Sequence, residues 1–298
     1  MSNIRFTGVM PAMLTPFNDD GSIKKDTVKA LMDYHYGCGV KGFYINGSTG
    51  EGPSLSLKTR LEMSETVMEN NNGRGVIIEH VGAPCYNDAV ELVKHADKVG
   101  VDAISSLAPN FYFSFTDDEI VDYYRSIASY TDKPLIVYVT AHIKSDVVKL
   151  VNRLMEIPTV IGLKYTLPDY FLMRKLCEVN GGDINIINGP DEMLICGLIM
   201  GAQGCIGSTY NVMPEWFVAE YDAAMKGDWE TARQIQYKIN RVIDVLLRYS
   251  ENGAIKGVKA AMTCKGFDMG NAVYPSKVYT ASELASLKAE LSALGIQF

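Results

Sequence analysis

The sequence predicts an α/β fold, a (β/α)8 TIM barrel with a carboxy-terminal helical extension. Short apolar runs recur about every 25 to 30 residues, and each is followed by an amphipathic stretch. Several runs are rich in Val and Ile without strict alternation, as in parallel strands that are covered on both faces. Eight such strands alternating with helices predict a sheet that closes into a barrel.

The runs that qualify as strands cover residues 8–14, 42–46, 76–81, 103–107, 135–139, 160–164, 184–188 and 204–206. Between them, helical stretches cover residues 24–37, 57–70, 87–99, 117–129, 145–155, 170–178 and 192–200. Many of these open with Ser, Asp or Asn, which cap helix amino termini. A doubly wound open sheet is the alternative, but no G-x-G-x-x-G follows the first strand.

The pattern changes after the eighth strand. Residues 215–225, 228–249, 254–264 and 282–293 are all predicted helices with no strand between them. We therefore expect a barrel over residues 1–214 and helices packed on it over residues 215–298, as one structural unit. The length of 298 residues agrees with this, because such barrels commonly run to about 250 residues as one domain.

The charge balance excludes several classes of partner. With 28 basic and 35 acidic residues the net charge is -7, so neither nucleic acid nor an anionic membrane surface is expected to bind. The longest apolar stretch, 193–202, is far shorter than the roughly 20 residues of a membrane span. Six scattered cysteines without C-x-x-C, and no secretory signal, predict reduced, buried thiols and a cytoplasmic location.

In such a barrel the active site lies at the carboxyl ends of the strands. The first candidate there is G-S-T-G-E at residues 47–51, directly after the second strand. Its glycines would let the backbone approach a ligand, and the free amides with the Ser48 and Thr49 hydroxyls could hold a carboxylate. A tight turn with a capping hydroxyl explains the same residues without a ligand.

The second candidate is Lys164, at the end of the sixth strand, beside the fifth strand, which carries Tyr138. Alternation places Ile136 and Tyr138 on one face, so a phenol could stand close to the amine. If Lys164 points into the barrel mouth, desolvation favours the neutral amine, a nucleophile toward carbonyl carbons. A strand terminus that reaches water is the alternative.

The third candidate is G-P-D-E at residues 189–192, after the seventh strand, where two carboxylates could hold the hydroxyls of a polyol. The helix dipole alone also favours acids there. The nearby loop 204–209 occupies a position that binds phosphate in many barrels, but it follows two acids and contains no Lys or Arg. The four histidines show no metal-ligand spacing, so no metal is expected.

Together, G-S-T-G-E at 47–51, the Tyr138 strand, G-L-K at 162–164 and G-S-T-Y-N at 207–211 resemble the N-acetylneuraminate lyase and dihydrodipicolinate synthase superfamily of class I aldolases. The likeness covers nearly the whole chain, from P-A-M-L-T-P-F at 11–17 onward. With N-G-P-D-E at 188–192, the chain looks most like the sialic acid lyase branch. This resemblance implies reversible cleavage of N-acetylneuraminate into pyruvate and N-acetylmannosamine. It also implies a homotetramer and a lysine Schiff base in place of any cofactor.

The resemblance also implies roles for individual residues. Lys164 would form the Schiff base with the keto acid, and Tyr138 would move the proton. Tyr112 would reach into the site of a neighbouring subunit. The other implied residues bind the substrate: Ser48 and Thr49 at the carboxylate, Thr166 near the reacting carbons, and Gly189, Asp191, Glu192 and Ser208 on the polyol side.

One segment departs from the family pattern. After Tyr138 the family usually has Asn, an apolar residue and Pro, whereas residues 139–144 are V-T-A-H-I-K. The synthase branch carries an arginine in this loop, and none occurs between Pro134 and Asn152, which argues against dihydrodipicolinate synthesis. In the family this loop borders the aldehyde pocket, so the nearest alternative is another pyruvate-dependent aldolase or synthase of the superfamily, which acts on a shorter 2-keto-3-deoxy sugar acid or, like dihydrodipicolinate synthase, on aspartate semialdehyde. A phosphate-binding isomerase and a catalytically silent binding protein are more distant ones.

Overall fold

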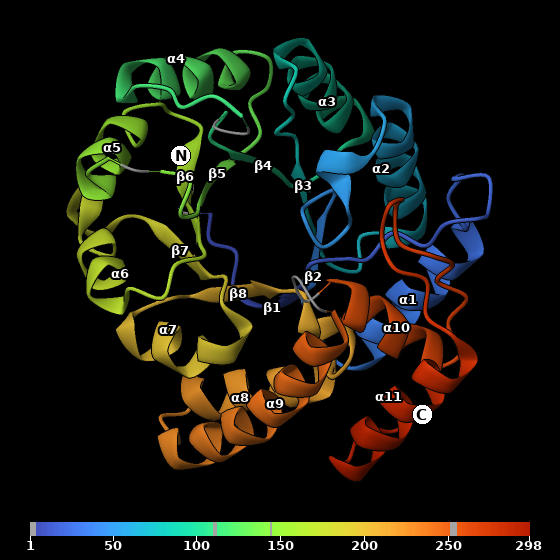
Figure 1. The fold of residues 1–298 in the computed structure, drawn as a ribbon. Helices are drawn as coiled ribbons and strands as arrows, with labels where there is room; N and C mark the ends of the chain where they lie inside the picture. Colours follow the sequence, from blue (N-terminus) through green and yellow to red (C-terminus); the bar gives the residue numbers. More distant parts are fainter. Residues whose placement is uncertain (1–3, 110–111, 144, 251–254) are drawn as a thin grey trace.

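A computed structural model of the chain describes residues 4–109, 112–143, 145–250 and 255–298. Parallel strands surround a central axis and helices surround the strands (Figure 1). The strands are β1 (Gly8–Pro11), β2 (Gly42–Ile45), β3 (Val76–His80), β4 (Ala103–Leu107), β5 (Leu135–Val139), β6 (Val160–Tyr165), β7 (Asn185–Asn188) and β8 (Gly204–Gly207).

The sheet is an eight-stranded barrel in which neighbours in the chain are neighbours in space. Strands β2 to β8 pair in order, and β8 pairs with β1. A parallel bridge between Ala12 and Tyr44 joins the ends of β1 and β2, and the amide of Met13 donates to the carbonyl of Tyr44 at 2.9 Å. The predicted (β/α)8 architecture is confirmed.

A helix follows each strand: α1 (Lys25–Gly37), α2 (Leu57–Asn71), α3 (Tyr86–Val99), α4 (Asp117–Ala128), α5 (Val147–Leu154), α6 (Tyr170–Leu176), α7 (Leu194–Met200) and α8 (Pro214–Met225). Three more lie beside this ring in Figure 1: α9 (Trp229–Ser250), α10 (Ile255–Cys264) and α11 (Ala281–Ala293). Helix α8 contacts both β1 and α9, so it links barrel and extension. The division at residue 214 stays a prediction, and residue 254, the expected start of α10, lies outside the described residues.

Several helices begin with a capping side chain, as predicted, whereas α1, α3 and α7 have no side-chain cap. Ser56 accepts a hydrogen bond from the amide of Thr59 at 3.1 Å, and α2 begins one residue later. The prediction of one helix over 192–200 is wrong at its start, because Asp191–Met193 form a 3-10 turn and Met193 has a non-helical φ of -132°. This break separates the two carboxylates of the 189–192 motif from α7.

Alternation along the strands produces two apolar cores. One side chain of each alternating pair points into the barrel, and its neighbours point toward the helices. On β5, Ile136 packs inside the barrel, while Val137 and Val139 pack in the outer core. The inner core contains Phe6, Met10, Ala12, Tyr44, Ile78, Ala103, Ile136, Ile187 and Ile206. It fills the barrel interior, so the residues at the carboxyl ends of the strands lie above a packed floor.

The cysteines are less buried than the sequence predicted. All six cysteines are unpaired, but only Cys205 is buried and Cys85 is exposed at the start of α3, so the prediction of six buried thiols is wrong. Cys205 is buried because it lies in strand β8, whereas Cys85 precedes α3 at its exposed amino terminus. Within the described ranges, every helix is too short or too polar to cross a bilayer.

Candidate functional site

Lys164 lies inside the barrel, near the carboxyl end of β6. Its flanking residues Leu163 and Tyr165 belong to the outer core, which leaves Lys164 on the inner face. Its Cα pairs in register with that of Tyr138 on β5. The side chain is 6% exposed, and among the described residues it forms no ion pair. A buried primary amine without a carboxylate partner is suited to attack on a carbonyl carbon.

Two aromatic rings cover this amine. The Nζ atom lies 4.0 Å from the ring centroid of Tyr138 and 4.4 Å from that of Tyr44. Each ring face attracts an ammonium group by about 1 kcal/mol, so the two rings hold Lys164 in place. The Tyr44 hydroxyl donates to Ser105 Oγ at 3.1 Å, and burial raises the pKa of Tyr44 well above its ordinary value. Tyr44 therefore stays neutral.

His80 completes the aromatic group. Its ring centroid lies 6.2 Å from those of Tyr44 and Tyr138. The amide of Leu107 donates to Nε2 at 3.2 Å, which places the ring proton on Nδ1. Burial, together with the charges of Arg60 and Lys164, lowers the pKa of His80 well below its ordinary value. His80 is therefore uncharged and lines the site.

Thr49 and Ser208 bring together two loops that are 159 residues apart in the sequence. Thr49 Oγ1 lies 2.7 Å from Ser208 Oγ, and Thr49 is buried while Ser48 is exposed. Thr15 donates to the carbonyl of Gly50 at 2.7 Å, and a Cβ on Gly50 would lie 2.9 Å from the carbonyl of Met13. The sequence suggested that glycines here let a ligand approach, but Gly50 is required for contact with the protein's own backbone.

Asp191 lies deep in the site, whereas its neighbour Glu192 is exposed. Both the amide and the hydroxyl of Thr209 donate to Asp191 Oδ2 at 2.7 Å. Burial raises the pKa of Asp191 to about 6, and the hydrogen bonds from Thr209 oppose that rise. The two acids of the 189–192 motif therefore have different surroundings, which sequence reasoning did not distinguish.

Helix α9 fixes the turn that carries these acids. Gln236 donates to the carbonyl of Asp191 at 3.2 Å, and Asn240 donates to the carbonyl of Glu192 at 3.1 Å. On the same side of the barrel, a Cβ on Gly189 would lie 2.0 Å from Thr166 Oγ1. That hydroxyl is buried and has no hydrogen-bond partner among the described residues. Thr166 and Gly189 are therefore in contact, and their expected roles toward a substrate stay predictions.

Tyr112 and the loop after β5 are the two remaining segments that the sequence singled out. Tyr112 is 90% exposed and makes an edge-to-face contact with the ring of Phe113, so its expected role in a neighbouring subunit stays a prediction. Residues 110 and 111, which precede Tyr112, lie outside the described residues, as does residue 144 of the unusual loop after β5. In that loop Thr140 Oγ1 accepts a hydrogen bond from the amide of His142 at 3.4 Å.

Sequence reasoning missed Tyr44 and His80. It searched the positions just past each strand, and these two lie within or at the end of strands β2 and β3. The signal was available, because period-two alternation from Ile78, which faces the inner core, places His80 on the same face. Within the portion of the chain that the structure describes, no three His, Cys, Asp or Glu side chains gather as a candidate metal site.

Comparison with known proteins gives one consistent result. The Dihydrodipicolinate synthetase family matches residues 5–294. An N-acetylneuraminate lyase of Rhizobium meliloti (strain 1021) is 37% identical over 286 residues, which cover 96% of this chain and 94% of that protein. The N-acetylneuraminate lyase of Enterobacter sp. (strain 638) is 36% identical over 258 residues, 86% of this chain and 85% of that protein.

Solved structures agree with the sequence comparison. The structure of Proteus mirabilis N-acetylneuraminate lyase superposes with a TM-score of 0.92 at 28% identity, and it covers 99% of this chain and 100% of that chain. The Ruminococcus gnavus sialic acid aldolase gives a TM-score of 0.91 at 28% identity, with 97% of each chain covered.

Proposed function

The chain belongs to the dihydrodipicolinate synthetase family, and we propose that it is a Schiff-base aldolase that reversibly cleaves N-acetylneuraminate into pyruvate and N-acetylmannosamine. The observation that carries the proposal is the buried Lys164 amine, 4.0 Å from the Tyr138 ring. The proposal includes a homotetramer in the cytoplasm, without metal or organic cofactor.

The reaction begins at Lys164. The Lys164 amine attacks the C2 ketone of the open-chain substrate, and loss of water leaves a protonated imine. As the C3–C4 bond breaks, its electron pair moves toward the imine nitrogen and forms an enamine. The Tyr138 hydroxyl accepts the proton of the C4 hydroxyl and passes its own proton to the substrate carboxylate, so C4 becomes the aldehyde of N-acetylmannosamine. Tyr138 returns a proton to C3, and hydrolysis releases pyruvate and the free amine.

The other predicted residues bind the substrate. Ser48 and Thr49 hold the carboxylate next to the imine, and Thr166 lies near the reacting carbons. Gly189, Asp191, Glu192 and Ser208 line the polyol side. Both Thr209 hydrogen bonds to Asp191 go to Oδ2, which supports a role for Oδ1 as an acceptor for a sugar hydroxyl. Tyr112 enters the site of a neighbouring subunit.

Trapping of the imine tests the reaction. Sodium borohydride with pyruvate should reduce the imine and add the mass of a reduced pyruvate adduct to the peptide that contains Lys164. Lys164→Ala should abolish both the adduct and turnover. The matched control is Lys175→Ala, because Lys175 also lies over an aromatic ring, Phe171 at 4.3 Å, but on the outer face of α6. Normal pyruvate release by Lys164→Ala would overturn the proposal.

A substrate panel tests the choice of sugar acid. Pyruvate release should be fastest with N-acetylneuraminate and slower with shorter 2-keto-3-deoxy sugar acids. Faster release from a shorter acid would assign the chain to another pyruvate aldolase of the family. Inhibition by sugar phosphates without imine formation would indicate the isomerase alternative, and thermal stabilisation by pyruvate without turnover would indicate a silent binding protein.

A further inference from the structure

A buried ion pair connects the carboxy-terminal helices to the G-S-T-G-E loop. Lys259 Nζ donates to Glu51 Oε1 at 2.8 Å, and the two side chains are 3% and 9% exposed. Within the described residues, no other ion pair has both side chains so deeply buried. Because an isolated charge is strongly unfavourable in such a place, each partner restricts the position of the other.

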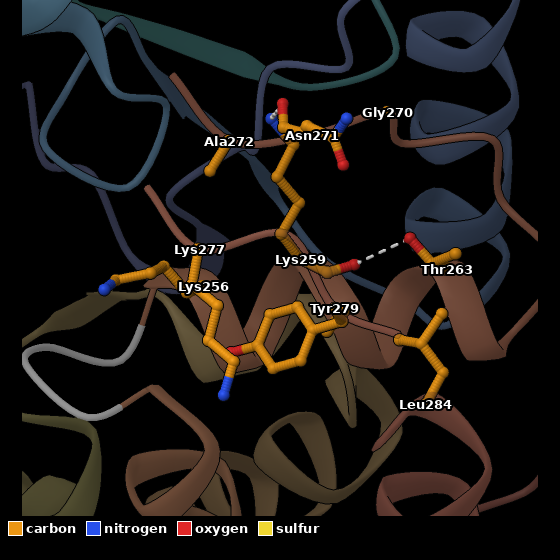
Figure 2. Close-up of a pocket in the computed structure, with 10 residues that line it drawn as sticks. Lys256, Lys259, Thr263, Gly270, Asn271, Ala272, Lys277, Tyr279 and Leu284 are labelled. Atoms are coloured by element: carbon orange, nitrogen blue, oxygen red, sulfur yellow. Dashed lines mark hydrogen bonds between the residues drawn. The ribbon is translucent and has the colours of Figure 1, made fainter. Parts of the chain in front are cut away.

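Glu51 and Lys259 each make further contacts with neighbouring residues. Glu51 Oε2 accepts a hydrogen bond from the amide of Val273 at 2.6 Å. Lys259 donates to the carbonyl of Asn271 at 3.0 Å, and its Nζ lies 4.3 Å from the ring centroid of Phe17. Figure 2 shows the Lys259 side chain extending from its helix toward Asn271 and Ala272.

The loop that this pair holds is the one expected to bind the carboxylate. The amide of Glu51 donates to the carbonyl of Ser48 at 3.0 Å, which couples the backbone position of Glu51 to that of Ser48. Glu51 also has a left-handed φ of 61°, a conformation that a non-glycine residue keeps only where its surroundings hold it. Ser48 and Glu51 share a cavity with Ile255, Lys256 and Val273 from the carboxy-terminal part of the chain.

We propose that Glu51 and Lys259 are positioning residues that hold Ser48 and Thr49 in the geometry that binds the substrate carboxylate. The inference rests on the proposed function of that loop. Neither side chain needs to touch the substrate, since both act through the loop backbone. The carboxy-terminal helices thereby set the affinity of the site for a 2-keto acid, while Lys164 and Tyr138 keep their own positions inside the barrel.

The test is a double-mutant cycle of Glu51→Gln, Lys259→Met and the double variant. Borohydride trapping is measured against pyruvate concentration, and folding is checked by circular dichroism and thermal unfolding. The double variant leaves no unpaired charge, so it carries the test even if a single variant fails to fold. The control is Arg248→Met, which breaks the exposed ion pair between α9 and Glu290 of α11.

Each single variant should raise the half-saturating pyruvate concentration by about 10- to 100-fold, the effect of losing one hydrogen bond to the charged carboxylate. The maximal trapping rate should change by less than about threefold, because the reacting groups are untouched. The half-saturating pyruvate concentration of the double variant should not exceed that of the weaker-binding single variant, because the two side chains act as a unit.

Two results would overturn the inference: folded variants whose half-saturation stays within about twofold of that of Arg248→Met, or effects of the single variants that multiply in the double variant. Failure of the proposed function has a different signature, because the wild-type protein would then form no adduct with pyruvate at all.

Discussion

Asp191→Asn should make the protein more stable and less active. Asp191 is 7% exposed, and its Oδ2 accepts two hydrogen bonds from Thr209. The amide oxygen of asparagine can accept the same bonds, while the substitution removes a buried carboxylate. Burial raises the pKa of this carboxyl from 3.8 to about 6, so the folded protein disfavours the ionised form.

The expected gain in stability depends on pH. A carboxyl whose pKa is higher in the folded than in the unfolded protein stabilises the fold at low pH, and this contribution is lost as pH rises through the folded pKa. The shift of Asp191 corresponds to about 3 kcal/mol. Part of this effect falls below pH 4, so the difference in unfolding free energy between Asp191→Asn and wild type should change by about 2 kcal/mol between about pH 4 and about pH 7, in favour of the variant.

Urea unfolding across this pH range measures the difference directly, since the other titrating groups are common to both proteins. Asp222→Asn, an exposed substitution on α8, is the control and should show no such trend. Borohydride trapping with pyruvate should be retained in Asp191→Asn, while kcat/KM for the sugar acid falls. A stability difference that stays constant within about 1 kcal/mol from pH 4 to 7 would refute the reasoning.

Three further predictions follow from the same site and core. Tyr138→Phe should lower kcat by about 10²- to 10⁴-fold while the Lys164 imine still forms in borohydride trapping, and an unchanged kcat would exclude Tyr138 as the proton carrier. Glu192→Gln should change the relative kcat/KM among sugar acids with different tails; equal ratios in both proteins would remove Glu192 from the pocket. Both carboxylate oxygens of Glu220 are buried without hydrogen-bond partners among the described residues, and burial raises its pKa to about 8. A carboxyl with a raised pKa destabilises the fold progressively as pH rises from its unfolded pKa to its folded pKa. The gain in unfolding free energy from Glu220→Gln, relative to wild type, should therefore be about 3 kcal/mol larger near pH 7 than near pH 4, as urea unfolding can measure. A gain that does not grow with pH would contradict this account of Glu220.

Local sequence patterns were enough to predict the barrel and its central pair. Eight apolar runs with helices between them determine strand order, because consecutive parallel strands become neighbours in such a fold. That order, with period-two alternation, brings Tyr138 and Lys164 into register on the inner face. Capping side chains such as Ser56 likewise predicted helix starts, since a cap depends only on residues within one turn.

Only the tertiary structure decided which polar groups are buried and what they contact. The pattern of residues 189–192 did not distinguish the buried Asp191 from the exposed Glu192, because the break at Met193 depends on packing against α9. Glu51 and Lys259 are 208 residues apart, and no local periodicity relates them. Periodicity reports which face of an element is apolar, whereas burial, pKa and charge pairing arise from elements that meet only after the barrel has closed.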